Sequence, residues 1–429
     1  MLPQIRSEEH LFSVPKFDLN KKDIKEFHNE LKGFHENFHD CFTRSESREH
    51  FYNYMSGQFS DLERKSIEPI ALTVKNGNIR AMQHFISDVQ WNDEKLIHKY
   101  RNMVTDDLGE PNGVVIFDES GFVKKGNDSV GVGKQYCGTL GKVENCQVGV
   151  FAAYASPQGY AFLDTRLFLP EKWFSDDYQD RREKCEIPQQ LTFKTKPQLA
   201  IEMLKTLEDS QQVPFKWVLG DSIYGDSPDF IEAVEAYNGV SYFVSTAEDT
   251  RCWLTAPITR KKQYHYGGQL LEKTVLETTE KKPITVSELA HSIHDFFWYR
   301  RLVSEGTKGP IEYEFTKRRI VLSKNGLPDR TVWLIMRRSL DKKPIYRYFI
   351  SNAPTSTRLP TFVWLSGLRW AIEQCLEEGK TELGMDHYEV RKYRGWYHHM
   401  LITMLAHFFL WHLKIRLGKK STVYYASAA

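Results

Sequence analysis

Cysteine is scarce in this chain, and its six residues stand singly, without a CxxC pair. This spacing argues against the disulfide framework of small secreted domains and predicts reduced, structural thiols. Long apolar runs are missing too. The nearest candidate, residues 400–415, contains His407 and His412 and is shorter than the roughly 18–20 residues of a spanning helix. The amino terminus lacks the apolar stretch of an export signal, so a cytoplasmic protein without a membrane partner is expected.

Signatures of several common enzyme classes are also missing. No HExxH pair occurs, so packing or surface roles are expected for the histidines rather than a zinc site. The GVGK and GTLGK pieces that end at Lys134 and Lys142 lack the GxxxxGK[ST] pattern of a phosphate loop, so no nucleotide cofactor is expected. Ser120 and Ser222 have no histidine partner at a recognised spacing, which makes a serine hydrolase improbable.

Length and composition indicate a globular protein with more than one structural unit. The 429 residues include 41% hydrophobic and 27% charged residues, close to average globular usage. The chain exceeds the size at which one hydrophobic core usually keeps growing. Two or three units are therefore expected.

The formal net charge of +2 hides an uneven distribution. Residues 251–350 carry 20 basic and 10 acidic side chains, a net charge of +10, whereas residues 1–113 carry 15 and 19, a net charge of −4. The basic residues cluster at positions 260–262, 300–301, 317–319 and 337–338. A surface of this kind suits a polyphosphate partner.

Aromatic residues are interleaved with these basic clusters, among them Trp253, Trp298 and Trp333. Two interpretations are open. The aromatics could stack on bases while the cations follow a nucleic-acid backbone, or they could form the core of a β-rich module whose cations are simply solvated. Composition favours neither.

Hydrophobic periodicity divides the chain into regions. Apolar positions at helical spacing predict helices over residues 20–42, 48–64, 79–86 and 92–103, an all-helical amino-terminal region. Strands are predicted at 113–120, 146–156, 159–169, 215–222 and 241–246, with helices at 196–209 and 228–237 among them. Residues 249–352 are typical of short strands. A long helix over 361–382 and a buried helix over 400–415 are expected to follow.

Two of these strands finish on an acidic residue. Asp118 is expected to end the first strand and Asp221 the fourth. Groups at the carboxyl ends of adjacent strands converge on one cleft in α/β sheets. Two carboxylates placed together would repel each other unless a cation neutralised them, and oxygen ligands suit Mg²⁺ or Mn²⁺. The sequence therefore predicts a divalent metal site.

A third carboxylate is expected from the helix that begins near residue 361. Arg369, Glu373 and Lys380 are spaced to share one helical face, while Leu368, Ile372, Cys375 and Leu376 can pack on the sheet. Glu373 could point into the cleft, or it could form a surface salt bridge with Arg369, which local spacing alone favours. Glu377 and Glu378 are alternatives for the third ligand.

Several segments together resemble the insertion-sequence-701 family of DDE transposases, cut-and-paste enzymes with a ribonuclease-H-like core. They are VVIFDESGFVKKG, YCGTLGKVENCQVGVF, WVLGDSIYGD, EGTKGP and LRWAIEQCLEEGKTELGMDHYEVRKYRGWYHH. The resemblance covers roughly residues 51–411. It implies an α/β fold in which a β-rich insertion interrupts a ribonuclease-H-like core, with an α-helical N-terminal region.

The resemblance also assigns roles to residues. It implies that Asp118, Asp221 and Glu373 are the catalytic acids and hold two Mg²⁺ ions, with Mn²⁺ as a substitute. Related enzymes carry the third acid in a Tyr-x2-Arg-x3-Glu-x6-Lys signature, which Arg369 and Lys380 match. Ser366 stands where the Tyr would be. The departure leaves the acids intact and affects whatever the Tyr does on the DNA backbone.

The resemblance further implies four regions: a helical DNA-binding region at 1–110, the two core parts at 111–248 and 353–429, and the insertion at 249–352. The insertion is expected to grip transposon-end DNA, with Trp253 or Trp298 stacking on a flipped base. The residues expected to contact DNA are Arg369, Lys380, Lys124, Lys125, Trp253, Trp298, Arg300, Arg301, Lys308, Arg391 and Arg394.

The expected protein is thus a DNA transposase that cuts double-stranded DNA at terminal inverted repeats and joins the freed ends to target DNA. A homodimer on DNA, in the bacterial cytoplasm with the nucleoid, is implied by the resemblance. Two alternatives remain: a catalytically silent DNA-binding protein derived from a transposase, and a structure-specific nuclease with the same core.

Overall fold

The computed structural model describes residues 21–267, 269–306 and 309–426, and the chain forms two compact units. The first, here called the helical unit, contains residues 21–215 and 370–426 of the described chain. The second, here called the strand-rich unit, contains residues 216–369. The chain therefore leaves the helical unit after residue 215 and returns to it at residue 370.

Helices open the helical unit, as the periodicity predicts. They are α1 (Lys21–Glu36), α2 (Ser45–Gln58), α3 (Ile67–Thr73), α4 (Ile79–Ser87) and α5 (Asp93–Leu108). The phenylalanines of the apolar stripe, including Phe34, Phe38 and Phe42, are buried among other aromatic side chains. Asn78 and Asn92 cap α4 and α5 by accepting a backbone N–H with their side chains, which fixes where these helices begin. Only the short α3 was not predicted.

Four strands with antiparallel pairing follow: β1 (Val114–Val123), β2 (Gly133–Cys137), β3 (Lys142–Ser156) and β4 (Gly159–Phe168). β3 pairs with each of the other three strands. Two differences from the sequence prediction matter. β1 continues past Asp118 because its pairing with β3 runs on to Val123, and β2 lies in the glycine-rich stretch that was expected to be a connection.

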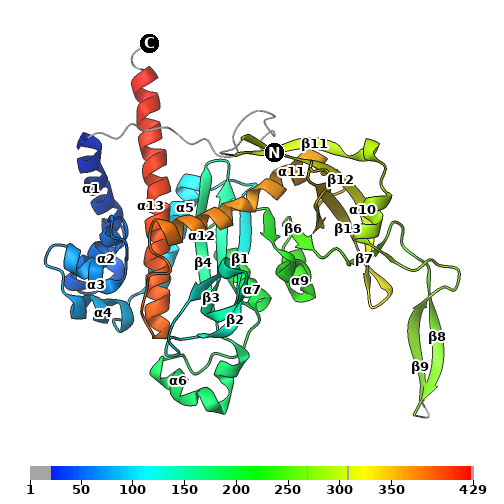
Figure 1. Cartoon of the computed structure of the whole chain (residues 1–429), viewed down its shortest axis with the longest axis horizontal. Coiled ribbons are helices and arrows are strands. Elements are labelled where there is room, and N and C mark those ends of the chain that lie inside the picture. The colour runs from blue at the N-terminus through cyan, green and yellow to red at the C-terminus, as the bar shows by residue number, and fades with distance from the viewer. Residues whose placement is uncertain (1–20, 268, 307–308, 427–429) are drawn as a thin grey trace. The chain divides into compact units, whose positions relative to one another are not determined.

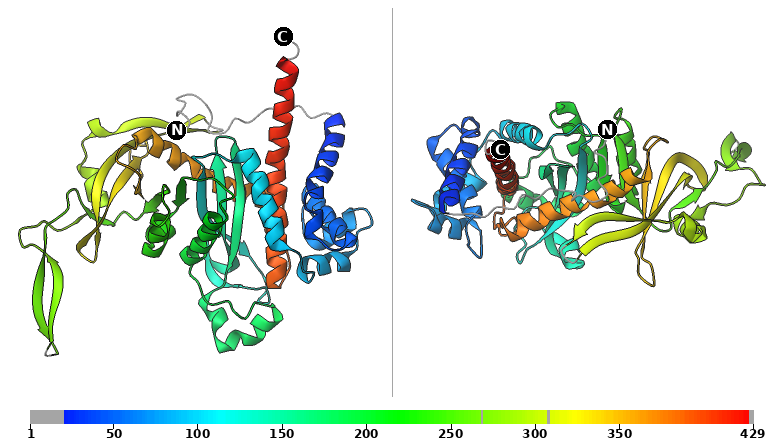
Figure 2. Two further views of the ribbon diagram at one scale, coloured as in Figure 1. Left: turned by 180° about the vertical axis from the view of Figure 1, so that it is seen from behind. Right: turned by 90° about the horizontal axis from the view of Figure 1, so that it is seen from above.

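Four more helices complete the helical unit: α6 (Gln179–Lys184), α7 (Lys196–Ser210), α12 (Trp370–Thr381) and α13 (Tyr393–Ala426). α13 contacts α2, α4 and α5 as well as β4, and it lies between the first four helices and the sheet (Figures 1 and 2). Its residues from Met400 to Phe409 are buried, as predicted. No helix in the described part of the chain is long and apolar enough to cross a membrane.

The strand-rich unit begins with a parallel pair, β5 (Trp217–Gly220) and β6 (Ser241–Thr246). They are joined through α8 (Ser222–Gly225) and α9 (Pro228–Glu235). Gly225 packs directly on β6, because a Cβ atom there would lie 1.9 Å from the Ser245 carbonyl oxygen. The strands and α9 agree with the sequence prediction.

The rest of this unit is mostly antiparallel. Its main strands are β12 (Gly309–Lys324), β13 (Leu327–Arg338) and β14 (Tyr346–Ser351), and β14 pairs with β6. β7 (Arg251–Trp253), β10 (Ile284–Thr285) and β11 (Tyr299–Gly306) extend the sheet on the β12 side. The helices α10 (Val286–Ser292) and α11 (Leu359–Leu368) complete the unit. β8 (Thr259–Tyr266) and β9 (Gln269–Leu276) form a separate two-stranded ribbon.

The expected fold class is therefore confirmed. Helices precede a mixed α/β arrangement of antiparallel and parallel strands, and a long β-rich segment is inserted between β6 and α11. The predicted helix over 361–382 appears as two helices, α11 and α12, separated only by Arg369. The four predicted domain bounds stay a prediction. All six cysteines are buried.

Candidate active site

Asp118 lies in the middle of β1, opposite Phe151 of β3, and not at the end of a strand as expected. It is half-buried, and its Oδ1 accepts a hydrogen bond of 2.8 Å from the Glu119 backbone N–H. Asp118 and Glu119 interrupt a strand whose flanking residues are buried. A polar pair inside such a strand marks the place where the sheet is open to a polar environment.

The next residue, Glu119, faces the other side of β1. Its Oε1 lies 2.8 Å from Nζ of Lys196, the first residue of α7. A capping box at Thr195 starts α7 at this point and so places Lys196. Because neighbouring side chains of a regular strand point to opposite faces, Asp118 shares a face with Ser120 and Phe122. Lys196 therefore balances the charge of Glu119, whose carboxylate lies within 4.8 Å of the Asp118 carboxylate.

α12 covers the Asp118 face of β1. Nζ of Lys380 donates hydrogen bonds to the Gly121 carbonyl oxygen at 3.2 Å and to Thr139 Oγ1 at 2.9 Å. It also lies 5.2 Å from the centre of the Phe122 ring. Burial lowers the pKa of Lys380. Lys380 therefore fastens the end of α12 to the strand that carries Asp118.

The packing of α12 agrees with the sequence prediction. Ile372, Cys375 and Leu376 are buried, and the helix contacts β1, β3 and β4. Glu373 lies in its first turn with an exposed side chain, two turns before Lys380. Asp118 and Glu373 thus belong to elements that pack together within one unit.

The two alternatives to Glu373, which are Glu377 and Glu378, differ from each other in burial. Glu378 accepts hydrogen bonds from Tyr160 Oη at 2.7 Å and Gln374 Nε2 at 3.0 Å, and His407 Nε2 lies 2.8 Å away. Burial raises the pKa of Glu378, but these contacts outweigh burial and leave its pKa below the usual value. Glu377 is exposed. Glu378 therefore has a structural role already, and the choice of Glu373 as the third acid stays a prediction.

Asp221 lies in the strand-rich unit, directly after β5, where the sequence predicted it. It caps α8, with Oδ1 accepting a hydrogen bond of 2.9 Å from the Ile223 backbone N–H. Ser366, the residue in place of the family tyrosine, is in the same unit. It is buried in α11, and its Oγ donates to the Val363 carbonyl oxygen at 2.7 Å. Ser366 therefore offers no exposed hydroxyl.

The predicted DNA contacts of the helical unit vary in exposure. Lys125 and Arg391 are exposed, and Arg391 Nη1 lies 3.6 Å from Asp128 Oδ2. Arg394 is half-buried and donates a 2.8 Å hydrogen bond to the Asp88 carbonyl oxygen. Lys124 points inward, because its Nζ donates to the Tyr388 carbonyl oxygen at 2.8 Å, and burial lowers its pKa to about 8.

In the strand-rich unit, both predicted tryptophans are buried. Trp253 donates its indole N–H to the Lys281 carbonyl oxygen, and Trp298 lies under the Arg338 guanidinium. Arg300 and Arg301 are exposed, and Arg300 is paired with Glu312. Arg369 is half-buried at the end of α11. Lys308 lies outside the described residues.

The aromatic residues beside Trp298, which the sequence also places among the basic clusters, are exposed. Phe296 is 77% exposed, and Phe297 and Tyr299 are 44% and 45% exposed. All four residues are adjacent in the sequence, so no local pattern separates the buried one from the others. Trp298 itself packs against Tyr346 of β14, a residue far from it in the sequence.

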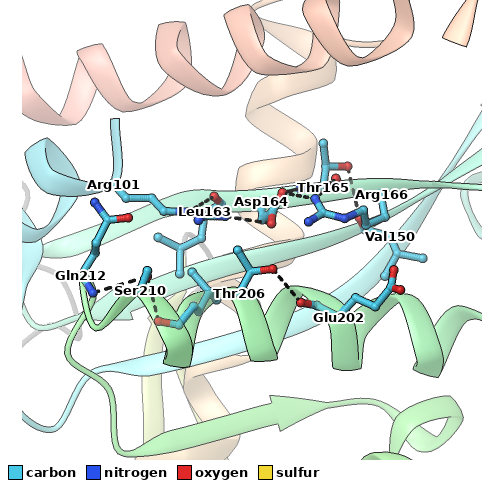
Figure 3. Close-up of polar contacts among 11 residues, drawn as sticks. Arg101, Val150, Leu163, Asp164, Thr165, Arg166, Glu202, Thr206, Ser210 and Gln212 are labelled. Carbon is cyan, nitrogen blue, oxygen red and sulfur yellow. Dashed lines mark hydrogen bonds and ion pairs between the residues drawn. The ribbon is translucent and has the colours of Figure 1, made fainter. Parts of the chain in front are cut away.

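A cavity of about 620 Å³ lies elsewhere in the helical unit, lined by residues of α5, β4, α7 and α13. Asp164 is buried at its wall, 2.8 Å from Arg101 Nη2 and 2.5 Å from Arg166 Nη1 (Figure 3). Arg394 lines the same cavity, whereas none of the three predicted catalytic acids does. The buried carboxylate joins α5 to β4 and is best explained as a structural ion pair.

Comparison with known proteins identifies the class of this chain. Residues 37–310, more than half of the chain, match the family described as DDE superfamily endonuclease, and the chain belongs to that family. The matched range includes Asp118 and Asp221 and ends before Glu373.

A more particular likeness is to the probable transposase for insertion sequence element IS701 of Microchaete diplosiphon. The two sequences are 27% identical over 340 residues, which is 79% of this chain and 75% of the relative. This likeness agrees with the family suggested by the sequence segments. Among solved structures, the NurA nuclease from Sulfolobus solfataricus matches 69% of this chain and 88% of its own at 11% identity, with a TM-score of 0.27. That score is too low to indicate a common fold.

Proposed function

We propose that this protein is a DNA transposase that cuts DNA at the ends of an insertion sequence and transfers the freed ends to target DNA. Family membership carries the proposal. It is supported by the likeness to a probable transposase and by carboxylates on β1, after β5 and on α12. In this proposal Asp118, Asp221 and Glu373 act together.

The three acids fit a divalent metal centre. Their carboxylate oxygens are the hard ligands that Mg²⁺ and Mn²⁺ prefer, and Asp118 and Glu373 are at least partly exposed. When bound, two ions stabilise charge on the attacking and leaving oxygens of a phosphodiester. Asp118, Asp221 and Glu373 would hold these ions.

The reaction that these residues would support has two steps. Water attacks the phosphorus at the transposon end, and the 3′ oxygen leaves as a hydroxyl. This hydroxyl then attacks a phosphorus of the target DNA, so one phosphodiester bond forms as another breaks and no ATP is consumed. Lys380 keeps α12 on β1 through Gly121 and thereby positions Glu373. Arg369 would contact the phosphate or orient Glu373.

The test is DNA cleavage by purified protein. The substrate is a plasmid that carries the genomic DNA flanking this reading frame on both sides. Asp118→Asn, Asp221→Asn and Glu373→Gln should each abolish Mg²⁺-dependent cleavage and leave DNA binding in a gel shift largely intact. Glu377→Gln, one turn further along the exposed side of α12, is the matched control and should cleave normally.

The outcomes also separate the two alternatives. Cleavage that persists in any of the three variants contradicts the assignment of that acid. DNA binding without cleavage by the native protein would indicate a catalytically silent DNA-binding protein. Cleavage without joining of the ends to a second plasmid would indicate a nuclease with the same core.

The proposal extends to partners and location. The DNA substrates would be terminal inverted repeats and target DNA, and pairing of two ends calls for at least a dimer on DNA. The protein would act in the bacterial cytoplasm, where the nucleoid provides its targets.

A further inference from the structure

The strand-rich unit carries a two-stranded ribbon, here called the arm, formed by β8 and β9 (residues 259–266 and 269–276). Among the described residues the two strands pair only with each other (Figure 1). Every residue of β8 is exposed, as is β9 up to Thr274. An isolated two-stranded hairpin is at best marginally stable in water. The arm is therefore expected to gain order from a partner.

The pairing register gives the arm two different faces. Residues directly opposite one another on paired strands share a face, and so do residues two apart on one strand. Lys262 pairs with Lys273, and Tyr264 pairs with Leu271. One face, here called the cationic face, consists of Arg260, Lys262, Tyr264, Tyr266, Gln269, Leu271, Lys273 and Val275. The opposite face contains Lys261, Gln263, His265, Leu270, Glu272 and Thr274.

Charge is distributed unequally between these faces. On the opposite face, Lys261 Nζ lies 2.6 Å from Glu272 Oε1, so the charge of Lys261 is balanced by this carboxylate. On the cationic face, Lys262 and Lys273 stand directly opposite each other, an arrangement of like charges that destabilises a strand pair. Arg260 lies 3.5 Å from Glu277 at the base of the arm. A polyanion would relieve the repulsion between the two lysines.

The cationic face also exposes aromatic surface. Tyr266 is 75% exposed and Tyr264 is 42% exposed. Exposed aromatic and apolar side chains beside cations are typical of surfaces that bind nucleic acid. Tyr264 and Tyr266 do not belong to the buried core of the strand-rich unit, so core packing does not explain their presence.

We propose that the arm docks on duplex DNA through its cationic face. The major groove admits a two-stranded β-ribbon, which makes it the docking place. Lys262 and Lys273 would contact phosphates, and the tyrosines would lie against the sugar and base edges. Alternate residues of a strand are about 6.8 Å apart, twice the 3.4 Å rise per phosphate of one DNA strand. This inference rests on the proposed function, because it takes DNA as the partner, but it assigns the contact to one face of one element.

The test compares Lys262 and Lys273 of the cationic face with Lys261 of the opposite face. Binding of the full-length protein to a fluorescein-labelled mixed-sequence duplex of about 30 base pairs is measured by anisotropy at several salt concentrations. Each phosphate contact contributes about 0.9 to the slope of log affinity against log salt. The variant Lys262→Ala/Lys273→Ala should therefore lower the slope by about 1.8 and weaken binding roughly 10- to 100-fold at 0.1 M salt. The matched control, Lys261→Ala, should stay within about twofold of the native protein.

A second pair of variants tests the aromatic part of the face. Tyr266→Ala should weaken binding, whereas His265→Ala, its neighbour on the opposite face, should not. Folding is checked by circular dichroism and urea unfolding, and both should be unchanged because the arm lies outside the core. Replacing residues 259–276 with a short glycine-serine linker should have at least the effect of the double lysine variant.

Three results would overturn the inference. They are an unchanged salt slope in the double variant, an equal loss in Lys261→Ala, and native affinity in the protein without the arm. If sedimentation showed that the variants lose self-association instead of DNA affinity, the face would bind a second copy of the chain, which also contradicts docking on DNA. If the arm variants bind DNA as tightly as the native protein while Asp118→Asn abolishes cleavage, docking of the arm on DNA is rejected and the proposed function stands.

Discussion

At the scale of single residues, the helical unit contains a buried histidine that must stay neutral. His399 of α13 lies between Tyr54 Oη, 2.8 Å from its Nδ1, and the Met385 carbonyl oxygen, 3.0 Å from its Nε2. Because the carbonyl can only accept, Nε2 carries the proton and Nδ1 accepts from the tyrosine. Burial lowers the pKa of His399 to about 3.

This arrangement predicts that the protein loses stability on mild acidification. Between the ordinary pKa of 6.5 and about 3, the unfolded imidazole binds a proton that the folded one does not. The free energy of unfolding therefore falls as the pH falls through this range, by up to about 1.4 kcal/mol per pH unit. His399→Gln should lower stability by about 2–3 kcal/mol at pH 7 and weaken its dependence on pH.

Urea unfolding at pH 7, 6, 5 and 4 measures this effect. His98→Gln, an exposed position on α5, is the control and should keep the native pH dependence. His35, whose pKa burial lowers to about 4, contributes to the same range, so His399→Gln should remove only part of the slope. Equal slopes in the native protein and His399→Gln would contradict the prediction.

At the scale of elements, α12 depends on Lys380 for its position on β1. The Lys380 ammonium group donates hydrogen bonds to the Gly121 carbonyl oxygen and to Thr139 Oγ1. Gly121 lies three residues after Asp118, and Thr139 lies twenty-one residues after it. Lys380→Met keeps the length of the side chain but loses both hydrogen bonds. We expect a loss of about 1–3 kcal/mol in stability and a fall in DNA cleavage of roughly 10- to 100-fold, by analogy with outer-sphere positioning residues.

The control for Lys380 is Lys414→Met on α13. Its ammonium is also partly buried and lies 3.9 Å from the Trp411 ring centre, but it belongs to a different helix. This variant should lose stability without a specific loss of cleavage. A role confined to stability would be indicated if Lys380→Met and Lys414→Met cleaved equally well at a temperature where both are folded.

At the scale of the whole molecule, the described residues of the strand-rich unit come from one stretch of sequence, 216–369, whereas this stretch interrupts the helical unit. β14 pairs with β6, and β6 pairs with β5. The inserted strands are therefore joined to the parallel pair by backbone hydrogen bonds. A cut at the predicted insertion bounds of 249 and 352 would remove β6 and leave β14 with an unpaired edge.

A fragment of residues 216–369 keeps the pairing of β6 with β14 and should therefore fold more stably than a fragment cut at the insertion bounds. It should bind the labelled duplex through the arm but should not cleave DNA, since Asp118 and Glu373 are outside it. A fragment of residues 249–352 should aggregate or remain unfolded. Circular dichroism and gel filtration of both fragments check this, and equal folding of the two would show that the β6 pairing is dispensable.

Prediction from sequence succeeded best where structure is local. β6 was predicted with its bounds, and apolar spacing located α4, α5 and α7 to within a few residues. It failed at β1, because the end of this strand depends on its pairing with β3. It failed at β2 for a related reason, since a glycine-rich stretch becomes a strand only when β3 lies beside it.

The sequence by itself determined the chemistry available to this protein: three separated carboxylates, an excess of cations between residues 251 and 350, and the apolar side of α12. These follow from residue type and from short-range periodicity. Only the tertiary structure decided that Trp253, Trp298 and Lys124 are turned inward, and that Lys262 faces Lys273 across the arm. Burial and cross-strand pairing depend on residues far apart in the chain, so no local pattern of side chains could have fixed them.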